Sequence, residues 1–86
     1  TYGVALANMG SVLLQMGRAR EAIRRLEQAV AITPDNVEAL NSLSLAYANE
    51  GDLEQALATI DRALKLRPSP QIQKLLRERR EQLSRR

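Results

Sequence analysis

The 86-residue chain carries 13 Lys and Arg against 10 Asp and Glu, and only Tyr2 and Tyr47 are aromatic. The absence of Cys and His excludes a disulfide framework and removes the two commonest soft metal ligands, so neither a metal nor a cofactor is expected. A chain this short forms at most one small domain with little room for a deep substrate cleft. The apolar run from Val4 to Ala7 is far shorter than the ~20 residues of a membrane span.

Apolar residues recur at helical spacing along the whole chain, and no strand-like alternation competes with them. Glycines, prolines and polar clusters interrupt this pattern. Short linkers between the segments make consecutive helices antiparallel. The sequence therefore predicts an all-α fold of five helices, near residues 3–16, 19–33, 37–50, 53–67 and 71–84.

Four residues account for the predicted helix ends. Gly17 and Gly51 follow the first and third helices, where a left-handed residue closes the last turn and glycine adopts that conformation without a Cβ clash. Pro34 and Pro68 disfavour the helical conformation at the residue before them, and so end the second and fourth helices.

The helix starts show a different set of side chains. Asp35 and Asp52 are each followed three residues later by Glu or Gln, so both are predicted to cap a helix, the third and the fourth. The second helix lacks such a cap because Arg18 stands where the aspartate would be. Ser69 followed by Pro70 predicts a capped start for the fifth helix.

Residues 34 positions apart repeat one another, which is typical of stacked helical hairpins. Small residues and breakers carry the repeat, and alanines seven apart on one helix face allow close packing. The chain resembles two tetratricopeptide repeats, with Leu6, Met9, Gly10, Leu13, Gly17, Ala22, Leu26, Ala29 and Pro34 repeated as Leu40, Leu43, Ser44, Tyr47, Gly51, Ala56, Ile60, Ala63 and Pro68.

This resemblance implies a short right-handed α-solenoid that forms a single helical-repeat domain over residues 1–86. Residues 3–36 would form the first repeat, residues 37–70 the second, and residues 71–86 a capping helix. The usual early aromatic of the first helix is replaced by Leu6 and Leu40, and Gly10 becomes Ser44, changes that conserve the size class. Because the chain opens with Thr1 rather than Met, we expect it to be part of a longer protein.

The resemblance also implies where a partner would bind, because in this family the first helix of each hairpin lines a concave groove. A mostly small and apolar lining with scattered amides suits an amphipathic helix or an extended segment of a protein partner. The alternative is that Val4, Leu14 and Leu45 pack against neighbouring helices. The predicted groove residues are Val4, Ala7, Ser11, Leu14, Gln15, Glu38, Asn41, Leu45, Ala48 and Asn49.

Some members of this family hold the terminal carboxylates of chaperones with basic and amide side chains. None of the corresponding positions here carries Lys, Arg or Asn, so this binding mode is not expected. These positions hold Ala7, Ser11, Ser42, Ile72 and Leu76.

Net charge is concentrated near the end of the chain. Residues 71–86 carry six basic and two acidic side chains, whereas residues 1–70 are close to neutral. Contact with a nucleic acid or an anionic surface through residues 74–86 is one alternative function. The favoured interpretation is a solvated face, since three opposite-charge pairs are four residues apart and no aromatic residue is present to stack on bases. These pairs are Lys74 with Glu78, Arg77 with Glu81, and Glu81 with Arg85.

Catalysis is not expected, because no set of reactive side chains converges in the sequence pattern. The prediction is a noncatalytic protein-interaction module that is soluble and cytoplasmic. A second hypothesis is a structural segment that self-associates or stacks on further repeats. Tyr2, Val4 and Ala5 would then be exposed on the first helix.

Overall fold

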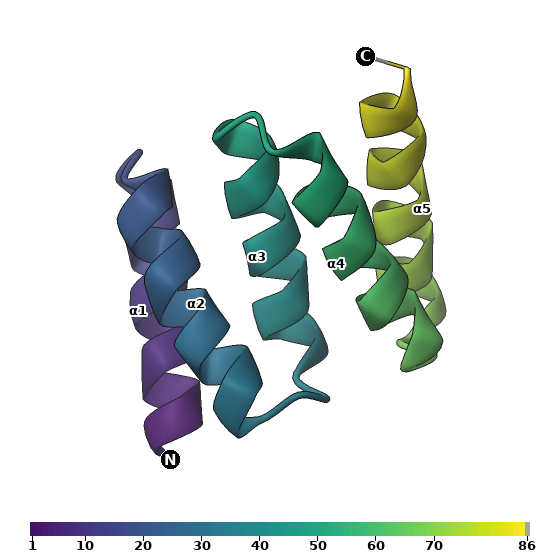
Figure 1. Ribbon diagram of the computed structural model, residues 1–86. Coiled ribbons are helices and arrows are strands. Elements are labelled where there is room, and N and C mark those ends of the chain that lie inside the picture. Colours follow the sequence, from purple (N-terminus) through teal and green to yellow (C-terminus); the bar gives the residue numbers. More distant parts are fainter. Residues whose placement is uncertain (86) are drawn as a thin grey trace.

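The computed structural model describes residues 1–85, and they fold into five helices. These are α1 (Tyr2–Gln15), α2 (Ala19–Ile32), α3 (Val37–Asn49), α4 (Leu53–Lys65) and α5 (Pro70–Ser84). The described residues contain no strand, so the predicted all-α helical-repeat fold is confirmed. The helices stand in a row, with the α1–α2 hairpin at one end, α3 and α4 in the middle and α5 at the other end (Figure 1).

Close approach of the paired helices rests on small side chains. The four repeat alanines of α2 and α4 are completely buried, as predicted from their spacing. A Cβ added at Gly10 would lie 2.5 Å from Leu26 Cγ and 3.3 Å from the Ala22 carbonyl oxygen, so only glycine fits between α1 and α2 here. Its counterpart Ser44 is completely buried in the second hairpin.

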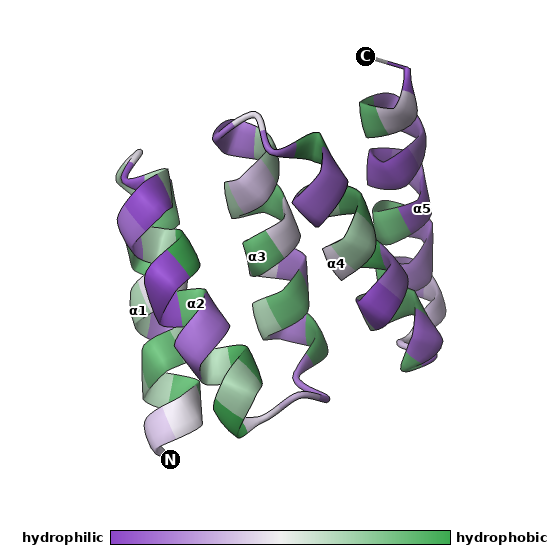
Figure 2. Ribbon diagram, in the orientation of Figure 1, coloured by the Kyte–Doolittle hydropathy of each residue, from purple (hydrophilic) through white to green (hydrophobic). Residues whose placement is uncertain are grey.

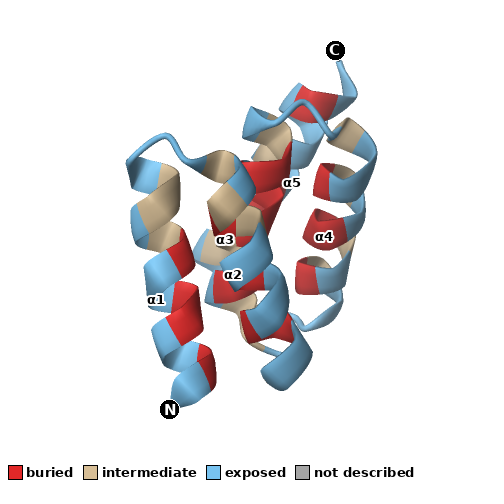
Figure 3. Ribbon diagram, turned by 60° about the vertical axis from the view of Figure 1, so that its left-hand side comes forward, coloured by how far each residue is buried: buried red, intermediate tan, exposed pale blue. Residues whose placement is uncertain are grey.

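The core is a chain of aliphatic side chains between the helices. The buried positions lie on the sides of the helices that face one another (Figure 3). Leu26 and Leu40 are among the largest fully buried side chains, and Ile60 and Leu76 continue the core toward α5. Burial of such side chains contributes about 1.5–3 kcal/mol each to folding.

The helix starts are capped as predicted, with one exception. The side chains of Asp52 and Ser69 accept hydrogen bonds from the backbone N–H groups of Gln55 and Ile72. Arg18 provides no side-chain cap to α2. The predicted cap at Asp35 is wrong, because α3 begins one residue later and Asn36 Oδ1 accepts from the Ala39 N–H at 3.1 Å. Asn is as good an N-cap as Asp, so the sequence alone did not separate the two.

The helix ends follow the predicted residues. Gly17 and Gly51 have φ values of 80° and 81°, in the left-handed region. Thr33 leaves the helical region before Pro34, with φ −130° and ψ 80°. Arg67, before Pro68, has left the right-handed helix but lies at φ 52°, which is unusual for a residue with a side chain.

Helix α5 packs one side against the second hairpin. Leu76 and Leu83 are buried and Ile72 is partly buried. A capping helix would also be expected to turn Leu75 toward this apolar face, but Leu75 is 41% exposed and that expectation is wrong. The rest of α5 is largely hydrophilic (Figure 2). None of the helices in residues 1–85 is both long and apolar enough to span a membrane.

Candidate functional site

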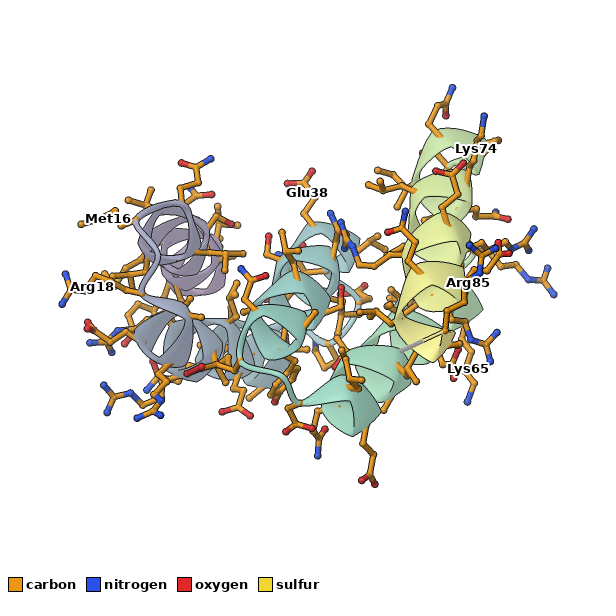
Figure 4. The ribbon with its side chains drawn as sticks, turned by 90° about the horizontal axis from the view of Figure 1, so that it is seen from above. Met16, Arg18, Glu38, Lys65, Lys74 and Arg85 are labelled. Atoms are coloured by element: carbon orange, nitrogen blue, oxygen red, sulfur yellow. The ribbon has the colours of Figure 1, made fainter. Side chains whose placement is uncertain are left out.

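Alternate helices lie on opposite sides of the molecule. Seen from above, α1 and α3 lie along one side with α2 and α4 along the other, and Glu38 projects from α3 into the space between α1 and α5 (Figure 4). A hollow of about 470 Å³ lies between α1 and α3 on this side. Its lining residues are Val4, Ala7, Asn8, Ser11, Asn36, Glu38, Ala39, Asn41 and Ser42.

The structure brings half of the predicted groove residues together in the α1–α3 hollow. From α1 these are Val4, Ala7 and Ser11, and from α3 they are Glu38 and Asn41. Val4 is 49% exposed, whereas Ala7 is buried. Two further lining residues, Ser11 and Ser42, are joined by a hydrogen bond between their Oγ atoms, which are 3.1 Å apart.

The other five predicted residues lie outside this hollow. Leu14 and Ala48 are partly buried and pack against the core. Gln15, Leu45 and Asn49 are exposed, and Leu45 retains 37% of its surface. The alternative that apolar groove residues pack against neighbours therefore holds for Leu14, whereas Val4 and Leu45 remain accessible.

A second hollow, of about 240 Å³, lies between α3 and α5. Glu38 and Asn41 line both hollows, so the two depressions meet across the surface of α3. Val37, Pro68 and Ile72 make the second hollow more apolar than the first. The sequence pattern did not indicate this extension, because it combines residues of α3 with the start of the predicted capping helix.

Arg79 is the principal residue that the sequence reasoning missed. The charge pattern predicts a solvated face for the basic residues of α5, but the Arg79 side chain crosses from α5 to α3 and its Nη1 donates to Asn41 Oδ1 and to Ser44 Oγ. A signal was present in the sequence. Arg79 is three residues after Leu76 and four before Leu83, which places it on the buried side of α5.

Other basic residues of α5 are engaged within the protein. Arg80 pairs with Asp61 of α4 at 3.2 Å, and Arg85 pairs with Glu81 as predicted. The two remaining predicted pairs, Lys74 with Glu78 and Arg77 with Glu81, are not formed. These internal contacts reduce the number of cations that α5 offers to an anionic surface.

The surroundings of Tyr47 shift its titration. It is buried between the hairpins, and its hydroxyl donates to Glu27 Oε2 at 2.5 Å. Burial raises the pKa of Tyr47 above its usual value, and the hydrogen bond and the charge of Glu27 raise it further. This contact links α2 to α3 and lies outside the two hollows. Within residues 1–85 no three acidic side chains are grouped as metal ligands.

These features define the class of protein. Paired antiparallel helices with the repeat glycines, alanines and prolines form a helical-repeat array with a hollowed face, and a family model described as "Tetratricopeptide repeat" matches residues 13–78. The chain belongs to the tetratricopeptide repeat family. This family generally mediates protein–protein interaction.

Similar proteins come from distant organisms. Cellulose synthase operon protein C of Escherichia coli strain K12 is 41% identical over 59 residues, covering 69% of this chain and 5% of that protein. The peroxisomal targeting signal receptor of Yarrowia lipolytica is 36% identical over 63 residues, covering 73% and 10%. Protein CTR9 homolog of Arabidopsis thaliana is 33% identical over 60 residues, covering 70% and 6%. The chain thus matches a tenth or less of the length of each of these relatives.

Proposed function

We propose that this chain is a noncatalytic module that binds a peptide or helix of a protein partner in the α1–α3 hollow. The observation that carries the proposal is the hollow itself, of about 470 Å³, on the face formed by the first helix of each hairpin. The Asn8 amide and the side-chain NH2 of Asn41, whose Oδ1 already accepts from Arg79, can satisfy a partner's backbone, and Val4 offers an exposed apolar contact.

Peptide binding is tested with a peptide library, because the fold does not specify the sequence of the partner. A library of short random peptides, capped at both ends, is selected on the immobilised chain, and the affinity of the best binder is measured by calorimetry. Two exposed residues at the hollow, Val4 and Asn8, are then changed together to Glu. Long charged side chains in the hollow obstruct a bound segment, so we expect at least about a tenfold loss of affinity.

A matched variant controls for charge. Gln28→Glu with Ala58→Glu places two carboxylates at exposed positions of α2 and α4, outside the lining of the hollow. Helices α2 and α4 lie on the side opposite α1 and α3 (Figure 4). This variant is expected to bind the peptide within about twofold of the unmodified chain. Equal weakening by both variants, or no weakening by either, would contradict the assignment of the groove.

We propose assembly through α1 as a second function, supported by an exposed apolar stripe that runs along this helix to its C-cap residue. Tyr2, Met9, Val12 and Met16 are all exposed, and α1 contains no charged residue. Met16 points away from the molecule (Figure 4). Such a stripe on a small domain is typical of a surface that contacts another protein segment.

Sedimentation equilibrium over a range of concentrations tests the second function. The unmodified chain is expected to increase in average mass with concentration, because burial of the stripe between two copies removes apolar surface from water. Met9→Glu with Val12→Glu should remain a monomer throughout. A monomer at every concentration for the unmodified chain would exclude self-association.

A further inference from the structure

Arg79 interrupts the apolar side of α5. Leu76 is completely buried and Leu83 is 5% exposed, and Arg79 lies between them on the same side of the helix. The arginine is itself only partly exposed. A charged side chain in such a position is costly to desolvate unless something compensates the charge.

The compensation found within the protein comes from neutral oxygens alone. Nη1 of Arg79 donates to the Asn41 carbonyl oxygen at 3.3 Å, to Asn41 Oδ1 and to Ser44 Oγ at 3.1 Å. Among residues 1–85 no carboxylate forms an ion pair with Arg79. Burial lowers the pKa of Arg79, and no neighbouring charge opposes this shift.

The arginines that do form ion pairs are exposed, unlike Arg79. Arg18, Arg20, Arg80 and Arg85 are all exposed, where a salt bridge contributes little, and yet each pairs with a carboxylate. The partly buried Arg79 would gain more from a carboxylate because less water screens the interaction. Its remaining nitrogens, Nε and Nη2, form no hydrogen bond with another described residue, so donors are left for an incoming group.

Arg79 is not part of the lining of either hollow, and its link to the groove is the hydrogen bond to Asn41. Two residues of α3 line both hollows. They are Asn41, which accepts the hydrogen bond from Arg79, and Glu38 one turn earlier. A peptide in the groove that carries a carboxylate would meet Arg79 at Asn41, and an adjacent apolar side chain could enter the hollow formed by Val37, Pro68 and Ile72. Glu38 is the one acidic residue in the lining of both hollows, and its charge opposes an acidic ligand.

We propose that Arg79 binds an acidic side chain of the partner peptide, and that an apolar residue beside this acid occupies the α3–α5 hollow. The inference rests on the proposed peptide-binding function and adds the chemistry of the ligand. Two opposed charges at the groove, Arg79 and Glu38, would then set the preferred position of the acid along α3.

The experiment uses two libraries of capped random peptides that differ in one respect. One library contains Asp and Glu, and the other replaces them with Asn and Gln. The best binder of the acidic library is synthesised again with each acid changed to its amide, and both peptides are titrated against the unmodified chain and against Arg79→Gln. Capping removes terminal carboxylates, so only side-chain acids are tested.

The acid-to-amide change in the peptide and Arg79→Gln in the chain should not have additive effects on the binding free energy. Losing the acid or Arg79 should each weaken binding at least about tenfold, and the second change should add little once the first is made. Arg77→Gln is the matched control, since it removes the same charge from an exposed position of α5 and should change affinity less than about twofold. Glu38→Gln is expected to tighten binding of the acidic peptide.

Arg79→Lys guards against a structural explanation. Lysine keeps the charge and loses the planar geometry, so a variant that folds normally should retain part of the preference for acid over amide. Equal recovery of binders from both libraries, with affinities unaffected by Arg79→Gln, would overturn this inference and leave the groove intact. Recovery of no binder from either library would overturn the proposed peptide-binding function as well.

Discussion

Helices α1 and α3 occupy equivalent places in the two hairpins and have opposite environments on one side. Met9 is 47% exposed and its counterpart Leu43 is 2% exposed, while Val12 is 53% exposed and its counterpart Ala46 is completely buried. The difference arises because α3 packs against α2, whereas α1 has no helix before it among the described residues. The same register position is therefore core in one repeat and surface in the other.

The test with the largest expected effect truncates Leu43 and Met9 to alanine in two separate variants. Leu43→Ala should lower the free energy of unfolding by about 2–5 kcal/mol, because it leaves a cavity between the hairpins. Met9→Ala should cost less than about 1 kcal/mol, since its side chain is already half in water. Urea unfolding followed by circular dichroism at low protein concentration measures both. A similar cost for the two would mean that another copy covers α1.

A second test exchanges the small residues at the hairpin contact. Gly10→Ser places in α1 the residue that stands at position 44 in α3, and its Cβ would overlap Leu26 and press on the Ala22 carbonyl oxygen. We expect a loss of about 1–3 kcal/mol of stability from this overpacking. Ala5→Ser, at an exposed position of the same helix, should change stability by less than about 0.5 kcal/mol. A tolerated Gly10→Ser would show that α1 can shift away from α2 at little cost.

The sequence was sufficient for features that depend on local stereochemistry. The positive φ values at Gly17 and Gly51, the helix ends before Pro34 and Pro68, and the five helix positions to within about two residues all follow from the residue types. The division into repeats at residues 36 and 70 stays a prediction.

The candidate groove was less accessible to sequence reasoning. The repeat pattern predicts that Ala7 and Ser11 face the partner, but Ala7 is buried and Ser11 is hydrogen-bonded to Ser42. Helix periodicity identifies a side of one helix and not the angle between two helices. The charge of Arg79 predicts solvation, whereas its place between the buried Leu76 and Leu83 puts it on the packed side of α5. Long side chains can bury their stems along apolar surface.

Tyr47 and its counterpart Leu13 give a third contrast between the hairpins. The Tyr47 hydroxyl joins α3 to Glu27 of α2, and Leu13 has no polar group to do the same. Tyr47→Phe should lower the free energy of unfolding by about 1–2 kcal/mol, because it removes a hydrogen bond to the carboxylate of Glu27, which is partly in contact with water. Tyr2→Phe, on the exposed end of α1, is the matched control and should have no measurable effect on stability.

The Tyr47 contribution should also depend on pH. Burial and the Glu27 contact raise the pKa of Tyr47 in the folded chain, so the folded chain retains the phenol proton to higher pH than the unfolded chain. The stabilisation is complete below the unfolded pKa of about 10 and is lost as the pH rises through the folded pKa. The stability difference between the unmodified chain and Tyr47→Phe, measured from neutral to alkaline pH, should shrink above about pH 10. A difference that stays constant would exclude this proton linkage.

The smallest expected effect concerns the ends of the helices. Gly51 closes α3 at φ 81°, whereas Arg67 follows α4 at φ 52°. This left-handed conformation is unfavourable for a residue that carries a side chain. Arg67→Gly should therefore raise the free energy of unfolding by about 0.5–1 kcal/mol, the relief of the left-handed strain being partly offset by the greater entropy of glycine in the unfolded chain. Gly51→Ala should shift stability in the opposite direction by a similar or larger amount, and both are measurable by urea unfolding. Arg67 is exposed and forms no salt bridge among residues 1–85, so its side chain is not expected to contribute to stability. A loss of stability in Arg67→Gly would therefore mean that the turn between α4 and α5 depends on a restricted backbone at residue 67. Pro68 already restricts this residue from its C-terminal side.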